Sequence, residues 1–393
     1  MTRPLPFMRI DLVFPALPPA LDGIGDHTTH LANGLSDHCD VRILTAQSDA
    51  TPIPGVQIAP VFSIDRPWGV HGIVDAVAEN PPDWLVLQFN QFSYGRWGFN
   101  PFLPHALKRI RRAAPETRIA WIAHEDFVPA TSLKFALMRL WQRWQFQALG
   151  GLADQIFFSI APWVDTYSPW FDGTPVHHLP IGSNMPYVDE DSSELRSSLG
   201  LDAPFVVGLF GTLRARLLDN VAAALTALQR HATDVVLLYI GPDGPALRET
   251  LPDLPLLDAG RLPADAVSRH LPLMDLHLTP FIDGVSTRRG SFMAGLQHGV
   301  PTLATEGELT DRLLRRLDGH AFMLSPRNDA DAFARAALTL YDNPEYRQRL
   351  GRNGKRLYND RFSFDVTVPA FLDILADAPT SFSTPASAPL PLP

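Results

Sequence analysis

The sequence predicts an α/β protein built of two doubly wound parallel sheets in tandem. Short, nearly continuous apolar runs alternate with amphipathic stretches, which is the pattern of parallel strands that helices cover on both faces. The alternation pauses over the polar, turn-rich residues 182–203 and then restarts. The chain has 393 residues, 46% of them apolar, which is enough for two domains with separate cores.

Apolar runs of strand length and periodic stretches of helix length locate the expected elements on both sides of the pause. Before it we expect strands at 8–14, 40–46, 84–89, 118–124 and 155–160, and helices at 26–36, 102–113 and 133–150. After it we expect strands at 205–211, 235–241, 255–260, 276–281, 301–305 and 322–325, and helices near 217–231, 264–271, 290–298, 310–318, 329–342 and 344–358.

These elements divide the chain into five parts. An N-terminal doubly wound domain at 1–183 is followed by a linker at 184–203 and a second doubly wound domain at 204–364. An amphipathic helix at 365–376 comes next, and residues 377–393 form a Pro-rich tail. The tail has almost nothing to bury, so we expect it to be disordered.

Composition and charge narrow the class of protein. A net charge of −9 and a pI near 5.8 argue against a nucleic-acid binder, which would normally be basic. The single cysteine, Cys39, excludes an internal disulfide and suits a reducing cytosol. Arg9 and Asp11 break the first apolar run, so we expect no signal peptide, and no window approaches the roughly 18 apolar residues that span a bilayer. No metal-ligand spacing of Cys or His appears. We therefore expect a cytoplasmic protein without a bound metal.

Ligands of doubly wound folds bind beyond the carboxyl ends of the strands, so the loops that follow the strands are the places to look for chemistry. The first of these loops contains Gly23 and Gly25, followed by Asp26 as a possible cap of the next helix. Glycines let a ligand approach the backbone, and a helix N-terminus favours anions. Tight-turn geometry alone is the alternative explanation.

Three titratable side chains follow the strand expected at 118–124. His124 stands where the buried strand opens into its loop, and Glu125 and Asp126 come directly after it. Titratable groups at the carboxyl end of a strand favour a functional site. A histidine that merely forms a hydrogen bond at the strand end is the alternative.

Two loops of the second half have the composition of anion sites. In LFGTLRARLLDN, Gly211 and Thr212 precede Arg214 and Arg216, and a helix follows. In TPFIDGVSTRRGSFMAGL, a pair of arginines precedes a Gly-Ser pair at the start of an apolar helix; these residues are Arg288, Arg289, Gly290 and Ser291. Guanidinium groups beside free backbone N–H groups at a helix N-terminus suit a diphosphate. Solvated surface arginines are the alternative.

The ordered set of these loops resembles the GT-B glycosyltransferases of family four. The resemblance covers nearly the whole chain up to about residue 376 and rests on the GIG loop, His124, FGTLRARLLDN, IGPDGP and DLHLTPFIDGVSTRRGSFMAGLQHGVPTLAT. Gly299 and Pro301 align with the glycine and proline of the family segment EGFGLPLLEAMACGTPVVAS. The resemblance implies two Rossmann-like domains that face a central cleft, with the closing helix returning to the first domain.

It also implies a retaining transfer of a hexose-like unit from a nucleoside diphosphate sugar, without a metal or other cofactor. The second domain would hold the donor and the first the acceptor. His124 would contact the donor sugar. The donor-binding residues would be Gly23, Gly25, Gly211, Thr212, Arg214, Arg216, Arg288, Arg289, Gly290 and Ser291.

The sequence departs from the family at two places. The two family glutamates, which have seven residues between them, fall at Ser286 and Ala294, and Asp283 is the nearest carboxylate. The usual lysine before an asparagine is also absent, because Asp219 precedes Asn220. These departures fit a divergent donor pocket whose charge the arginines supply. They equally fit a non-catalytic GT-B protein that binds a partner or a sugar nucleotide, and a sugar-nucleotide epimerase on the same fold is a third hypothesis.

Three further segments have two interpretations each. The aromatic loop 88–102 suits stacking on a saccharide, lipid-linked or small-molecule acceptor, through Asn90, Tyr94, Arg96 and Trp97. The basic, aromatic stretch 133–149 either packs on a sheet or makes peripheral contact with the inner face of a membrane. The acidic run 189–191 has the form of a metal-binding D-x-D motif, but no strand precedes it, so we interpret it as solvated.

Overall fold

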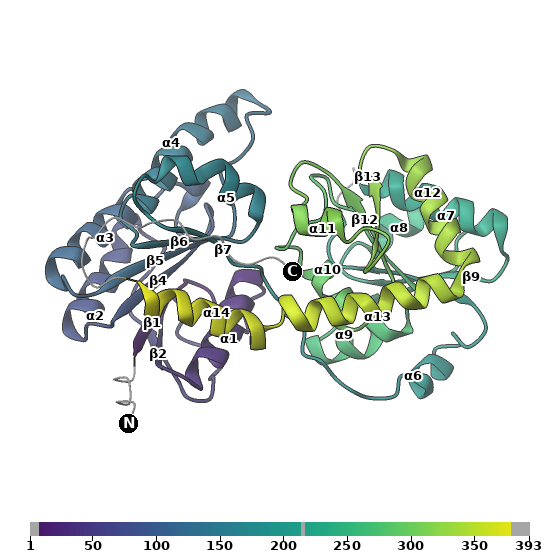
Figure 1. The fold of residues 1–393 in the computed structure, drawn as a ribbon, viewed down its shortest axis with the longest axis horizontal. Helices are drawn as coiled ribbons and strands as arrows, with labels where there is room; N and C mark the ends of the chain where they lie inside the picture. Colours follow the sequence, from purple (N-terminus) through teal and green to yellow (C-terminus); the bar gives the residue numbers. More distant parts are fainter. Residues whose placement is uncertain (1–7, 214–216, 379–393) are drawn as a thin grey trace. The chain divides into compact units, whose positions relative to one another are not determined.

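The structure is a computed structural model, and it describes residues 8–213 and 217–378 (Figure 1). The chain divides into two compact units. One runs to Leu179 and resumes at Thr367, and the other is Pro180–Val366. Each unit contains one parallel sheet with its own core.

The sheet of the first unit has seven parallel strands in the order β3-β2-β1-β4-β5-β6-β7. The strands are β1 Arg9–Val13, β2 Asp40–Thr45, β3 Val56–Pro60, β4 Trp84–Phe89, β5 Arg118–Ala123, β6 Gln155–Phe158 and β7 Val176–His178. The helices are α1 Gly23–Ser36, α2 Gly72–Glu79, α3 Phe102–Ala113, α4 Leu133–Gly150, α5 Ala161–Tyr167 and α14 Phe364–Asp377, which belongs to this unit from Thr367.

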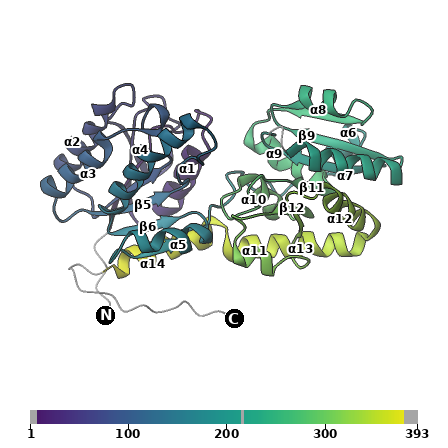
Figure 2. The ribbon, with the colours of Figure 1, turned by 90° about the horizontal axis from the view of Figure 1, so that it is seen from above.

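Neighbouring residues of β6 show how helices cover both faces of this sheet. The Phe157 ring lies 4.8 Å from that of Phe371 in α14, and the Phe158 ring lies 5.9 Å from that of Phe146 in α4. Successive side chains of a strand point to opposite faces, so α14 and α4 pack on opposite sides (Figure 2). The strands between them are mostly apolar for this reason.

The second unit repeats the plan with six parallel strands in the order β10-β9-β8-β11-β12-β13. The strands are β8 Phe205–Phe210, β9 Val235–Ile240, β10 Leu256–Gly260, β11 Leu276–Thr279, β12 Thr302–Glu306 and β13 Met323–Pro326. The helices are α6 Ser193–Ser198, α7 Leu218–His231, α8 Gly244–Thr250, α9 Ala264–His270, α10 Gly290–Gln297, α11 Arg312–Arg316, α12 Ala330–Asp342 and α13 Pro344–Arg361.

Every strand expected from the sequence is present, within about two residues of its predicted bounds. The sequence interpretation missed the outermost strands of the first sheet, β3 and β7, and the short helices α2, α5, α6 and α8. Strand β3 is partly exposed and ends in Pro60, as an edge strand can. Helix α8 starts at Gly244 within the IGPDGP segment, because a proline is tolerated in the first turn of a helix.

Residues 184–203, expected to be a linker, lie within the second unit. The Val188 backbone N–H donates to the Ser268 hydroxyl at 3.0 Å. Arg196 of α6 donates to the Leu273 carbonyl at 2.7 Å and pairs with Asp275. The acidic run contributes Glu190 to an exposed pair with Arg269. The segment therefore packs on the second sheet's helices instead of running free.

The strand order decides which loops share one edge of each sheet. In the first unit the order reverses between β1 and β4, and in the second between β8 and β11. Such a reversal leaves a crevice at the carboxyl ends of the two strands, where ligands of this fold class bind. The loops after β1 and β4, and those after β8 and β11, are therefore the ones placed to form sites.

Candidate functional site

The loop after β1 ends in a capped helix. The Asp22 carboxylate accepts hydrogen bonds from the backbone N–H groups of Ile24 and Gly25, at 2.8 and 3.1 Å. Asp22, not Asp26, is thus the cap of α1. A side chain at Gly25 would place its Cβ 2.4 Å from the Ala16 carbonyl oxygen, so close packing already requires glycine there. Burial, with a smaller contribution from Asp22, raises the pKa of Asp26 to about 6.

Behind this helix, one buried amide joins two histidines. The side chain of Gln88, at the end of β4, is fully buried. Its Oε1 lies 2.5 Å from His124 Nε2, and its Nε2 lies 3.4 Å from His27 Nδ1. Burial lowers the pKa of His27 to about 3, so that ring is neutral and its Nδ1 accepts from the amide. Gln88 then accepts from His124 Nε2–H, which fixes the orientation of the His124 ring.

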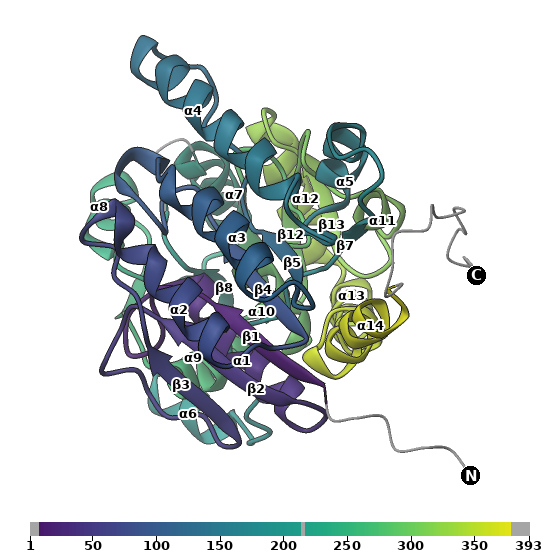
Figure 3. The ribbon, with the colours of Figure 1, turned by 90° about the vertical axis from the view of Figure 1, so that its left-hand side faces the viewer.

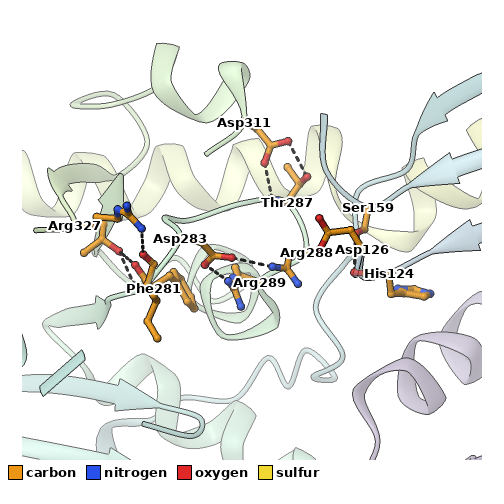
Figure 4. Close-up of polar contacts among 12 residues, drawn as sticks. His124, Asp126, Ser159, Phe281, Asp283, Thr287, Arg288, Arg289, Asp311 and Arg327 are labelled. Atoms are coloured by element: carbon orange, nitrogen blue, oxygen red, sulfur yellow. Dashed lines mark hydrogen bonds and ion pairs between the residues drawn. The ribbon is translucent and has the colours of Figure 1, made fainter. Parts of the chain in front are cut away.

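The other two titratable residues after β5 differ from His124 in their surroundings. His124 is 7% exposed, and its carbonyl accepts from the Ser159 hydroxyl at 3.4 Å (Figure 4). The Asp126 carboxylate accepts from the Tyr167 hydroxyl at 2.8 Å. Burial, and then the charge of Asp126, raise the pKa of Tyr167. Glu125 is exposed.

The aromatic loop after β4 separates into a buried and an exposed part. Tyr94 is fully buried, and its hydroxyl lies 2.9 Å from the Val13 carbonyl. Asn90 accepts from the Phe92 backbone N–H. The Trp97 ring is 55% exposed and lies 5.5 Å from the Arg96 guanidinium carbon. An acceptor could therefore contact Asn90, Arg96 and Trp97, whereas Tyr94 is part of the core.

In the second unit, the loop after β11 gathers two arginines around one aspartate. Asp283 forms an ion pair with Arg288 at 3.0 Å and a second with Arg289 (Figure 4). The Arg289 guanidinium carbon also lies 4.9 Å from the centre of the Phe281 ring. The two arginine side chains are 11% and 25% exposed. The cationic pair is therefore held in place and half-neutralised by its own carboxylate.

A second aspartate fixes the backbone of the same loop. Asp311 is 1% exposed and accepts from both the backbone N–H and the hydroxyl of Thr287, at 2.8 and 3.2 Å. The Thr287 carbonyl accepts from the Ile181 N–H at 2.9 Å. Gly284 has a φ of 89°, and a Cβ there would lie 2.2 Å from the Gly307 nitrogen. The loop that bears the arginines is therefore rigidly positioned.

The N-terminus of α10 lies next to the turn after β8. Arg289 is its N-cap residue, and among the described residues no side chain caps the helix. A Cβ at Gly290 would meet nothing within 4 Å, and one at Gly211 would lie 3.9 Å from Ser291 Cβ. The Gly211 turn is tied by its carbonyl to the Tyr239 hydroxyl at 2.9 Å. Open backbone N–H groups and two arginines thus share one place, which suits a phosphate anion.

The remaining residues that the sequence singled out are either exposed, buried in the core or outside the described residues. Thr212 is exposed beside the Gly211 turn, whereas Arg214 and Arg216 lie outside the described residues. Ser286 is fully buried, and Ala294 lies in a core cluster with Val206 and Leu238. Neither position therefore supplies a carboxylate to the site.

Sequence reasoning missed three polar residues that organise these sites. Gln88 stood out only as the polar residue of an otherwise apolar strand, WLVLQF. His27 and Asp311 gave no signal, because their partners are 61 and 24 residues away. Across residues 8–213 and 217–378, no group of three His, Cys, Asp or Glu side chains could hold a metal ion.

No family model and no curated protein matches this sequence. Solved structures do match it over most of its length. HepE from Anabaena, in complex with UDP and glucose, has a TM-score of 0.65 at 14% identity and covers 94% of this chain and 99% of that one. The sucrose-phosphate synthase of Thermosynechococcus elongatus has a TM-score of 0.72 at 15% identity, covering 94% and 98%. WaaG, a glycosyltransferase involved in lipopolysaccharide biosynthesis, has a TM-score of 0.64 at 14% identity, covering 94% and 100%. The likeness shows the fold and confirms the predicted fold class, two Rossmann-like parallel-sheet domains as in the GT-B proteins.

Proposed function

We propose that this chain is a glycosyltransferase that moves a hexose-like unit from a nucleoside diphosphate sugar to an acceptor, with retention and without a metal. The observation that carries the proposal is the cationic pair Arg288–Arg289 at the open N-terminus of α10. The fold, shared with HepE, which has been solved with UDP-glucose, supports the same donor class.

The donor diphosphate would lie against the second unit. Backbone N–H groups of Gly290 and Ser291 would bind its oxygens, and the two arginines would supply the charge. The turn at Gly211 and Thr212 lies beside this helix end, and Arg214 and Arg216 follow it in the sequence. As the bond between the anomeric carbon and the diphosphate breaks, negative charge grows on the leaving group. Fixed cations and N–H groups stabilise that charge without reorganising.

The first unit would supply the donor-sugar contact and the acceptor site. His124 would contact the donor sugar, and Gly23 and Gly25 would lie near the donor phosphates. The acceptor, a saccharide, a lipid-linked molecule or a small molecule, would contact Asn90, Arg96 and Trp97. We place the enzyme in the cytoplasm, because a chain with a single cysteine, Cys39, suits a reducing compartment.

Replacing Gln88 by leucine should lower kcat about tenfold while leaving the UDP dissociation constant unchanged. The change keeps the side-chain volume but removes the acceptor that orients His124. Steady-state kinetics and calorimetric titration with UDP would separate the two quantities. Thr117→Val is the matched control: it removes another buried hydrogen bond of this sheet, from Thr117 to the Pro82 carbonyl, and should leave kcat unchanged. A similar loss of kcat in both variants would make Gln88 a purely structural residue.

The experiment that tests the proposed function is a thermal-shift screen of the full chain against nucleoside diphosphates and their sugar conjugates. A ligand present at about 100-fold its dissociation constant stabilises the folded state by about 2.7 kcal/mol, which raises the melting temperature by several degrees. A selective shift with one nucleotide, followed by retained anomeric configuration in the product, would support the proposal. No shift with any of them would contradict it.

One observation favours a second candidate function. Because Ser286 is buried and Ala294 lies in the core, neither position that would carry a family glutamate offers a carboxylate. A protein that binds a sugar nucleotide without transferring the sugar would show the same arrangement. It would give the thermal shift but no turnover with any acceptor. An epimerase would instead convert the sugar nucleotide without any acceptor.

A further inference from the structure

Helix α4 has two apolar faces, of which only one is buried. Its inward face is buried at Met138, Gln142, Gln145, Phe146 and Leu149, and the Phe146 ring packs on Trp121 and Phe158 of the first sheet. The outward face carries Leu133, Leu137, Leu140 and Trp144, at intervals of four, three and four residues, which align in one stripe. These side chains are 81%, 50%, 68% and 49% exposed. The outward face of a helix in a soluble domain is normally polar, so this stripe requires an explanation.

The aromatic loop after β4 extends the stripe. Trp97 has a φ of 58°, a left-handed conformation that bulky residues rarely adopt. Its carbonyl accepts from Trp141 Nε1 at 3.1 Å and from Gln142 Nε2 at 3.2 Å, so α4 holds the loop in this shape. The exposed Phe99 ring lies 6.1 Å from the ring of Trp141. The unusual backbone therefore fixes two aromatic rings beside α4 while leaving them partly exposed to solvent.

We refer to Leu133, Leu137, Leu140, Trp144, Trp97 and Phe99 as the α4 patch. Figure 3 shows that the first turns of α4 extend beyond the other elements of the first unit. Within residues 8–213 and 217–378, no helix is long and apolar enough to cross a bilayer.

The charges around the patch indicate the partner's chemistry. Helix α4 carries Lys134, Arg139 and Arg143 and contains no Asp or Glu. The Lys134 ammonium lies 5.8 Å from the Trp97 ring, on which Arg96 also packs. The chain as a whole has a net charge of −9, so this positively charged face has the opposite sign to the rest of the chain. A second copy of the chain would bring these cations against their equivalents, whereas an anionic surface would be attracted by all of them.

We propose that the α4 patch docks the protein on an anionic phospholipid surface. Helix α4 lies in the plane of the interface, with its leucine stripe and the Trp97 and Phe99 rings at the boundary of the acyl chains. Lys134 and Arg96, which lie beside Trp97, reach the lipid phosphates at the edge of the stripe. Exposed aliphatic and aromatic residues flanked by Lys and Arg are the composition of interfacial helices. This inference does not depend on the proposed sugar transfer.

The test is co-sedimentation of the full chain with phospholipid vesicles. We expect binding to vesicles of equal parts phosphatidylcholine and phosphatidylglycerol, weaker binding to phosphatidylcholine alone, and weaker binding to the former at high salt. The double variant Leu137→Glu, Leu140→Glu should reduce partitioning about tenfold or more, because two exposed leucines no longer enter the interface. Val366→Glu is the control, a glutamate at another exposed helical position, 37% exposed in α14.

Three results would overturn the proposal. The first is no sedimentation of the wild-type chain with anionic vesicles. The second is equal binding by the double variant and the wild type, or an equal loss in Val366→Glu. The third is a wild type that self-associates and a double variant that does not, while both bind vesicles equally. The patch would then be an interface between copies of the chain. Circular dichroism checks that the double variant is folded; if it is not, Leu140→Gln replaces it, with the same expected direction.

Discussion

Replacing Arg288 and Arg289 together by methionine should weaken UDP binding by about two orders of magnitude. Each charge-assisted hydrogen bond to a phosphate contributes about 1.5–3 kcal/mol, and methionine keeps much of the packing of the arginine stem. The loop itself should survive the change, because Asp311 fixes its backbone through Thr287. Calorimetric titration with UDP measures the effect, and the unfolding midpoint reports whether the second unit stays intact.

Asp283 provides a control of opposite sign. It pairs with both arginines and would lie close to a diphosphate bound by them. Asp283→Asn keeps a hydrogen-bond acceptor but removes the competing negative charge, so UDP should bind about tenfold more tightly. Weaker binding in this variant would show that the carboxylate orients the arginines more than it competes with the ligand. Unchanged binding in the double arginine variant would remove both arginines from the donor site.

The fold could be predicted from the sequence because its strands are buried on both faces. Such strands give continuous apolar runs that stand out between amphipathic helices, and all of those runs became strands. Edge strands lack this signal. Strand β7 has only three residues, two of them histidines. The residues of β3 are partly or fully exposed. Neither strand has an apolar run long enough to be distinguished from a loop.

The candidate site was predictable only where its residues are close in sequence. The arginine pair and the glycine-serine start of α10 are adjacent, so their common position at a helix N-terminus followed from the pattern. The pairing of both arginines with Asp283 depends on the loop's turn at Gly284, which sequence spacing does not specify. The contact of Gln88 with His124 depends on the register of β4 and β5. Tyr94 was predicted to contact the acceptor, but it is buried in the core, and the burial of an aromatic residue in a loop cannot be predicted from composition.

The same limit applies to a buried ion pair in the first sheet. Asp11 and Arg42 are direct partners in the β1–β2 register, and Arg42 Nε donates to Asp11 Oδ1 at 2.9 Å. The two residues are 1% and 9% exposed. In the sequence, Asp11 only interrupts an apolar run, and Arg42 looks like a solvated strand residue. Burial raises the pKa of Asp11, and the hydrogen bond and charge of Arg42 oppose that rise.

Replacing Arg42 by methionine should therefore destabilise the protein by about 3–5 kcal/mol near neutral pH, because the Asp11 carboxylate stays buried without its cation. Without Arg42 the folded-state pKa of Asp11 should rise further above its unfolded value. A carboxyl with a raised folded pKa binds its proton more tightly in the folded state, so the variant should regain stability as the pH falls through that pKa. Urea unfolding of the first unit at a series of pH values measures this dependence.

The double variant Asp11→Leu, Arg42→Met separates loss of the ion pair from loss of packing. It removes the buried charge together with its partner, so it should recover most of the stability that the single variant loses and should show little dependence on pH. The size of that recovery measures how much of the cost is the unpaired carboxylate. If the double variant were as unstable as Arg42→Met, the cost would arise instead from the hydrogen bonds that Arg42 donates to the Ala76 and Asn80 carbonyls. Those bonds tie β2 to the end of α2, and their loss would be independent of pH.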